Sequence, residues 1–137
     1  MMGCTAATDP ATCAGGGAPL LELGDGGRSA FVAFADGVAL PTSTNGLTLE
    51  MQTSGIDTTQ NVTAVVRIAA DGGPSEDSIA ALSLQCESAA DGTGFGWAGV
   101  IASLPASTVE GSAIDIEAVI TDWRGITATT SLSASVR

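Results

Sequence analysis

The clearest pattern of apolar and polar positions lies between residues 113 and 136. Over 113–121 apolar and polar side chains alternate, and the apolar face carries Ile114, Ile116, Ala118 and Ile120. Over 126–136 small apolar side chains alternate with Ser and Thr. A period of two is typical of a strand with one buried face. Between the segments, Asp122 can hydrogen-bond its own turn and Gly125 can adopt a positive φ. The pattern predicts a β-hairpin.

The same alternation predicts shorter strands upstream. The expected strands cover residues 20–23, 29–35, 47–53, 61–70, 78–87 and 95–104. The segments between them are rich in Gly, Pro, Asp and Ser, and the acidic segment 71–77 is expected to be a loop because Gly and Pro together cannot continue a strand ladder. Helical periodicity does not extend beyond a single turn. These spacings predict an all-β domain over 20–137, a single antiparallel β-sandwich of about eight strands.

Parity along each expected strand assigns the core positions. The residues expected to face inward are Leu47, Leu49, Met51, Val62, Ala64, Val66, Ile68, Leu82, Leu84 and Cys86. A core position is also expected for Trp97, because large aromatic side chains bury much apolar area. Trp123 lies in the hairpin turn, where a large apolar side chain is costly to expose, so it is the candidate for an interface.

Residues 1–19 are expected to form a separate N-terminal arm. The arm has low complexity, contains the triplet Gly15–Gly17 and shows no hydrophobic period, so it cannot form a core element by itself. Such a segment is ordered only when something holds it. Three alternatives are open: a disulfide between Cys4 and Cys13, packing on its own domain, or docking on a neighbouring subunit.

Composition excludes several classes of function. The formal net charge of −11 argues against nucleic-acid and anionic-membrane partners, which are bound through Lys and Arg clusters. The absence of His removes the usual general base and the commonest metal ligand, so Ser-His-Asp and Cys-His catalysis are excluded and zinc is not expected. We therefore expect no enzyme activity and no small-molecule substrate. A membrane-spanning run and a complete secretory signal peptide are also absent from the sequence.

The three cysteines, Cys4, Cys13 and Cys86, leave one odd thiol, which in a secreted protein suggests pairing between chains. Cys86 is either a buried free thiol or the partner of Cys4 or Cys13, within one subunit or from a neighbour's arm. Gly3 followed by Cys4 also resembles the end of a lipoprotein signal, where a small residue precedes the acylated cysteine.

Calcium is the one cofactor that the sequence leaves open, and we otherwise expect none. The acidic segment 71–77, with Asp91 and Asp122, offers the oxygen ligands that calcium takes. The sequence lacks a D-x-D-x-D-G loop, however, and scattered surface carboxylates are more often simply solvated.

Two segments resemble a known family. The hairpin IEAVITDWRGITATTSLSASV is similar to the last two strands of bacterial immunoglobulin-like domains. The segment LELGDGGRSAFVAFADGVAL resembles the opening of secreted immunoglobulin-like lipoproteins from high-GC bacteria, where an E-L-G-x-G motif precedes an aromatic strand and an A-D-G turn. The resemblance implies an immunoglobulin-like sandwich at the bacterial surface or envelope with structural or adhesive work, and it carries over no catalytic residue.

Two functions are therefore expected. The first is an extracellular structural subunit that self-assembles into a homo-oligomer, a filament or surface polymer, by docking its arm on a neighbour, with or without a disulfide lock. The second is a monomeric envelope lipoprotein or adhesin module that binds a carbohydrate or a protein through its loops.

Overall fold

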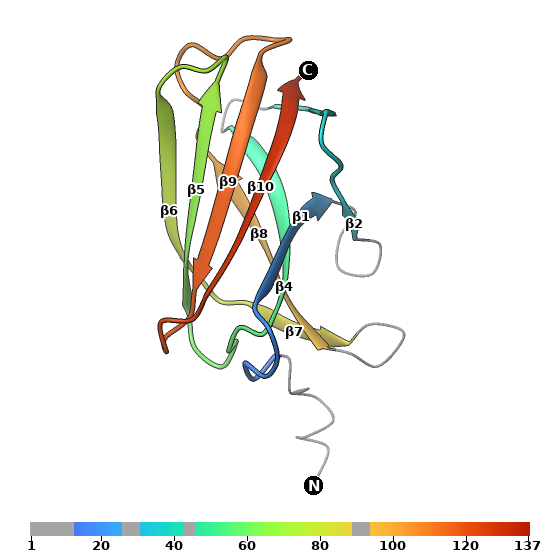
Figure 1. Cartoon of the computed structure of the whole chain (residues 1–137), viewed down its shortest axis with the longest axis vertical. Helices are drawn as coiled ribbons and strands as arrows, with labels where there is room; N and C mark the ends of the chain where they lie inside the picture. Colours follow the sequence, from blue (N-terminus) through green and yellow to red (C-terminus); the bar gives the residue numbers. More distant parts are fainter. Residues whose placement is uncertain (1–12, 26–30, 43–45, 89–93) are drawn as a thin grey trace, which may run out of the picture.

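Two β-sheets packed face to face make up the fold (Figure 1). The structure is a computed structural model and describes residues 13–25, 31–42, 46–88 and 94–137. All its regular elements in these ranges are strands, in agreement with the all-β fold expected from the alternation of side chains.

The first sheet has the spatial order β2-β1-β4-β8-β7, and all its neighbouring strands are antiparallel. Its strands are β2 (Val32–Ala33), β1 (Leu20–Asp25), β4 (Leu47–Ser54), β8 (Gly94–Ala102) and β7 (Gln85–Ser88). β7 pairs only with the beginning of β8, and β2 pairs only with the end of β1.

The second sheet has the order β3-β10-β9-β5-β6. Its strands are β3 (Val38–Leu40), β10 (Thr127–Val136), β9 (Ala113–Thr121), β5 (Val62–Ala70) and β6 (Ser75–Leu82). β3 runs parallel to β10, and the other pairs are antiparallel. The hairpin predicted from residues 113–136 is confirmed as β9 and β10.

The core lies between the sheets and follows the predicted faces. Leu47, Leu49 and Met51 of β4 are fully buried, as are the inward residues of β5 and the isoleucines of β9. Their outward neighbours are exposed or half-buried. Burying one face of each sheet against the other removes the apolar stripe from water, which is the main force that holds a sandwich together.

The single strand predicted over residues 78–87 is wrong, and the described residues contain ten strands instead of about eight. β6 belongs to the second sheet and β7 to the first, so the chain crosses between the sheets after Leu82. Leu84 is buried at this crossing. The period of two therefore continues through the crossover, although the backbone has changed sheets.

The loop predicted over residues 71–77 is also too long. β6 begins at Ser75, and the turn is compressed to 71–74, where Asp71 and Gly72 both adopt positive φ. Asp77 lies within the strand, and its carboxylate accepts two hydrogen bonds from the Arg67 side chain on β5, the shorter at 2.8 Å from Nε. An edge strand exposed to solvent tolerates such charges.

Trp97 does not lie in the core, contrary to the prediction. It pairs with Gln52 on the outer face of the first sheet, where its indole Nε1 donates a 3.2 Å hydrogen bond to Glu50. Glycines at 94, 96 and 99 hide the parity of this strand in the sequence. The segment expected as a strand over 29–35 is reduced to Val32–Ala33, and residues 29–30 lie outside the described part of the chain.

The sandwich has two ends of different construction (Figure 1). The arm end consists of residues 13–19, the β4–β5 loop over 55–61 and the β9–β10 turn over 122–126. The opposite end consists of the β5–β6 turn over 71–74, the β8–β9 connection over 103–112 and Arg137. β9 runs from one end of the sandwich to the other: it starts with Ala113 at the opposite end and finishes with Thr121 at the arm end.

Candidate functional site

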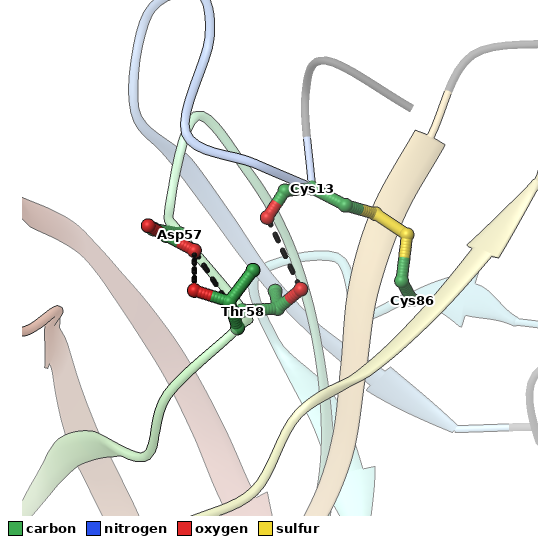
Figure 2. The surroundings of a disulfide bond; sticks show 5 residues. Cys13, Asp57, Thr58 and Cys86 are labelled. Carbon is green, nitrogen blue, oxygen red and sulfur yellow. Dashed lines mark hydrogen bonds between the residues drawn. A yellow bond between two sulfur atoms is a disulfide. The ribbon is translucent and has the colours of Figure 1, made fainter. Parts of the chain in front are cut away.

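The arm end contains a disulfide that joins the N-terminal arm to the first sheet (Figure 2). Cys13 is bonded to Cys86 of β7, and their Cα atoms are 5.8 Å apart. Cys13 is fully buried. A segment with no hydrophobic period thus supplies one core residue and a covalent link across 73 positions of the sequence.

Backbone contacts fasten the same segment to the β4–β5 loop. Thr58 donates two hydrogen bonds to the Cys13 carbonyl oxygen, from its backbone N–H at 2.8 Å and its hydroxyl at 3.1 Å. Ala14 forms an antiparallel bridge with Asp57. Figure 2 shows the Cys13 carbonyl turned toward Thr58 while its sulfur points toward Cys86. The segment is therefore held on both sides.

The carboxylate of Asp57 is buried, and both its oxygens accept hydrogen bonds. Oδ1 accepts from the Thr59 hydroxyl at 2.6 Å and the Thr59 N–H at 2.9 Å, and Oδ2 accepts from Trp123 Nε1 at 2.8 Å. The Thr59 hydrogen bonds, with smaller contributions from Trp123 and the charge of Arg124, lower the pKa of Asp57 below its ordinary value. The carboxylate is an ionised structural group.

A second buried carboxylate, Asp122, organises the β9–β10 turn. Oδ1 accepts from the N–H groups of Arg124 and Ile126, which is the local turn bonding predicted from the sequence. Oδ2 accepts from Arg124 Nη2 at 2.6 Å and from the Asp57 N–H at 3.1 Å. Burial of the carboxyl raises its pKa, but the Arg124 side chain and the backbone donors outweigh burial, so the pKa lies below its ordinary value.

Arg124 connects the turn to the other two segments of the arm end. Its guanidinium pairs with Asp122 and reaches the carbonyl oxygens of Gly15 at 3.4 Å and Gly55 at 3.5 Å. Gly55 has a φ of 74°, and a side chain there would collide with the backbone of Ala18. The arm is thus packed directly against the backbone of the loop, with one cation joining all three segments.

The charged side chains of the arm end are all engaged in contacts that hold its three segments together. Every carboxylate oxygen of Asp57 and Asp122 accepts at least one hydrogen bond, and the Asp122 charge is paired with Arg124. Charge-assisted bonds of this kind are the strong members of a hydrogen-bond network. The arrangement fastens the base of the arm, from Cys13 onward, to its own domain.

The residues considered for calcium are not brought together. Asp71 accepts from the Ala113 N–H at the opposite end, whereas Asp122 lies at the arm end and Asp91 is outside the described residues. Within residues 13–25, 31–42, 46–88 and 94–137, there is no group of three His, Cys, Asp or Glu side chains suited to a metal ion.

The structure settles the pairing of two of the three cysteines. Cys13 and Cys86 pair within the chain, so neither the Cys4–Cys13 bond nor a free thiol at Cys86 is found. Cys4 lies outside the described residues. Trp123, the interface candidate, is 56% exposed although its indole N–H is bonded to Asp57.

Sequence reasoning missed Asp57 and Arg124. The segment Asp57-Thr58-Thr59 carries a local signal, since an Asp often accepts a hydrogen bond from the backbone two residues on. The contacts of Asp57 with Trp123 and of Arg124 with Gly15 join residues far apart in the chain, which no local pattern indicates.

No protein-family model matches this chain, and no curated protein matches it. The described part of the chain has no helix of the length and apolarity needed to cross a membrane.

Proposed function

We propose that this chain is a non-enzymatic, extracellular immunoglobulin-like domain of a bacterial envelope, displayed from an attachment point in the arm. The strand order supports the immunoglobulin-like assignment. β1-β4-β8-β7 corresponds to strands A-B-E-D, and β10-β9-β5-β6 corresponds to G-F-C-C′. The domain departs from antibody domains in its disulfide, which joins the arm to β7 instead of joining the two sheets at B and F.

An extracellular location is supported by the disulfide itself. Disulfides persist in oxidising compartments and are rare in the cytosol. Cys13 is fully buried next to β7, so the bond is part of the packed structure and not a surface accessory.

The observation that carries the proposal is the way the arm is fastened. The Cys13–Cys86 bond takes two of the three cysteines and fixes the base of the arm, which leaves Cys4 as the cysteine available for attachment. Gly3 before Cys4 has the small side chain that precedes an acylated cysteine. An acyl chain on Cys4 would join the membrane to the disulfide-bonded base of the arm about nine residues away, a span of roughly 30 Å when extended.

The experiment compares native material from the producing bacterium with a Cys4→Ser variant. We expect the wild-type protein to fractionate with membranes and its N-terminal peptide to carry the mass of an acyl group. The variant is expected in the soluble fraction with the Cys13–Cys86 bond intact. A wild-type N-terminus without acyl modification, or a variant that remains with the membrane, would contradict the proposal.

Self-assembly through the arm is the second candidate, and the exposed Trp123 favours it. The indole lies in the turn that Arg124 joins to Gly15, so a neighbour bound at the arm end would cover it. Cys13 and Cys86 are bonded to each other, so a covalent lock between subunits would use Cys4. Non-reducing electrophoresis and electron microscopy of the same native material separate the two candidates. The second candidate, unlike the first, requires Cys4-linked dimers or filaments that Trp123→Ala abolishes, and unlinked single particles would rule it out.

A further inference from the structure

Among the described strands, β6 is the longest strand at an edge of either sheet. The other edge strands have two, three and four residues, namely β2, β3 and β7, whereas β6 has eight. Only β5 pairs with β6 among the described strands. An unpaired strand edge presents a row of N–H and C=O groups that another strand can bind, and short edges or covering segments normally prevent this.

The outward face of β6 carries an apolar side chain at its centre. Ile79 is 70% exposed, more than any other large apolar side chain in the described residues. It lies opposite Val65 of β5, which in turn lies opposite Val119 of β9. Val65 and Val119 are half-buried, so an apolar row crosses three strands of the outer face and ends at the open edge. A single exposed Ile is ordinary, but one that ends such a row at an edge favours a partner strand.

The sequence of β6, SEDSIAAL, is divided by charge. Its acids, Glu76 and Asp77, lie in the first half, and the second half from Ile79 to Leu82 has no charged side chain. Arg67 already pairs with Asp77 at 2.8 Å, so within the described part of the chain Glu76 is the acid of β6 without an ion pair. A parallel partner of the same sequence would place acid beside acid, whereas an antiparallel one places the acidic half beside the apolar half.

We propose that β6 pairs two copies of this chain, antiparallel about a twofold axis at Ile79. In this register Ile79 lies opposite the partner's Ile79, Asp77 opposite the partner's Ala81, and Glu76 opposite the partner's Leu82. The apolar row of one copy continues into that of the other, and the two second sheets form one continuous sheet. Because the same surface is used on both copies, the contact closes at a dimer. The proposal does not depend on how the arm is attached.

The net charge of −11 sets the salt dependence of the pairing. Two acidic copies repel one another at long range, and salt screens that repulsion. Dimerisation through β6 is therefore strengthened by salt. A basic peptide bound to the acidic half of the edge would instead be weakened by salt, which distinguishes the two occupants.

Analytical ultracentrifugation of the full chain with Cys4→Ser tests the pairing, at concentrations up to about 0.5 mM. We expect a monomer–dimer equilibrium whose Kd falls as salt rises. Ile79→Lys is expected to raise Kd by about tenfold or more, because it places two lysines opposite each other. Val109→Lys is the matched control, since Val109 is 65% exposed but lies in the β8–β9 connection. A chain that is monomeric throughout, or a dimer that both substitutions affect equally, would overturn the proposal.

Oxidative cross-linking tests the register in the same background. Ile79→Cys places two thiols directly opposite each other, within the reach of a disulfide. Ala81→Cys places its two copies about four residues out of register, roughly 13 Å apart along the strands, too far for a bond. We expect covalent dimer from Ile79→Cys and none from Ala81→Cys. Equal cross-linking of both variants, or no cross-linking of Ile79→Cys, would overturn the twofold axis at Ile79. Melting temperatures equal to that of the parent would show that the variants are folded.

Discussion

The two ends of the sandwich are built by different means. The arm end is held by a disulfide, two buried carboxylates and an arginine that touches three segments. The opposite end is held mainly by backbone hydrogen bonds. The N–H of Gly111 donates to the Val136 carbonyl, the N–H of Val136 donates to the Ser112 carbonyl, and the N–H of Arg137 donates to Leu40 of β3. Its buried polar side chain is Ser112. At the opposite end, backbone hydrogen bonds hold the ends of strands that are already packed in the sheets. The N-terminal arm has no apolar periodicity, so it is held in place by covalent and ionic contacts.

The largest effect is expected from the disulfide. Closing a loop of 73 positions restricts the unfolded chain, and the chain-entropy relation assigns this about 4 kcal/mol. We therefore expect Cys13→Ser with Cys86→Ser to lower the free energy of unfolding by about 2–4 kcal/mol in urea denaturation. Cys4→Ser is the matched control and should leave stability unchanged. A double variant as stable as the control would show that the arm end does not depend on the bond.

Asp57 and Asp71 give a matched pair of acids at the two ends. Asp57→Asn turns an amide N–H₂ toward either Thr59 or Trp123, both of which are donors, and we expect a loss of about 1–3 kcal/mol. Asp71→Asn keeps an acceptor for the Ala113 N–H and is exposed, so its cost should be within about 0.5 kcal/mol. Urea denaturation measures both. Equal losses would remove the distinction between the ends.

Acid should weaken the contribution of the two buried carboxylates of the arm end. The pKa values of Asp57 and Asp122 are lowered in the folded protein, so the unfolded chain binds more protons in acid and stability rises with pH. Their contribution is complete above the unfolded pKa of about 3.9 and is lost as pH falls through the lower folded values. Unfolding free energies measured from neutral pH down to about pH 2 should fall less steeply for Asp57→Asn/Asp122→Asn than for the wild type. Parallel profiles would contradict this assignment.

The smallest expected difference concerns two arginines. Arg124→Ala leaves the buried Asp122 carboxylate without its cation, and we expect a loss of about 1–2 kcal/mol. Arg137→Ala removes one exposed hydrogen bond to the Ala39 carbonyl at the opposite end and should cost less than about 0.5 kcal/mol. Thermal unfolding compares them. A larger effect of Arg137→Ala would mean that the opposite end also depends on side-chain contacts.

Local pattern predicted much of the fold because a strand's period is a property of consecutive residues. The faces of β4, β5, β9 and β10 followed from alternation, and the Asp122 turn followed from its own residue types. The same reasoning failed at residues 78–87, where Leu84 remains buried while the chain changes sheets. It failed again at Trp97, because neighbouring glycines have no side chains to reveal the parity of the strand.

The sequence by itself determined that the chain is all-β, that residues 113–136 form a two-stranded hairpin, and that the net charge is acidic. It also determined that the number of cysteines is odd, so that one cannot pair within the chain. Only the tertiary structure decided that Cys13 pairs with Cys86, that Asp57 bonds Trp123, and that Arg124 reaches the arm at Gly15. These contacts join residues that only the packing of the two sheets brings to one end. Their partners depend on distances in space, whereas periodicity records only distances along the chain.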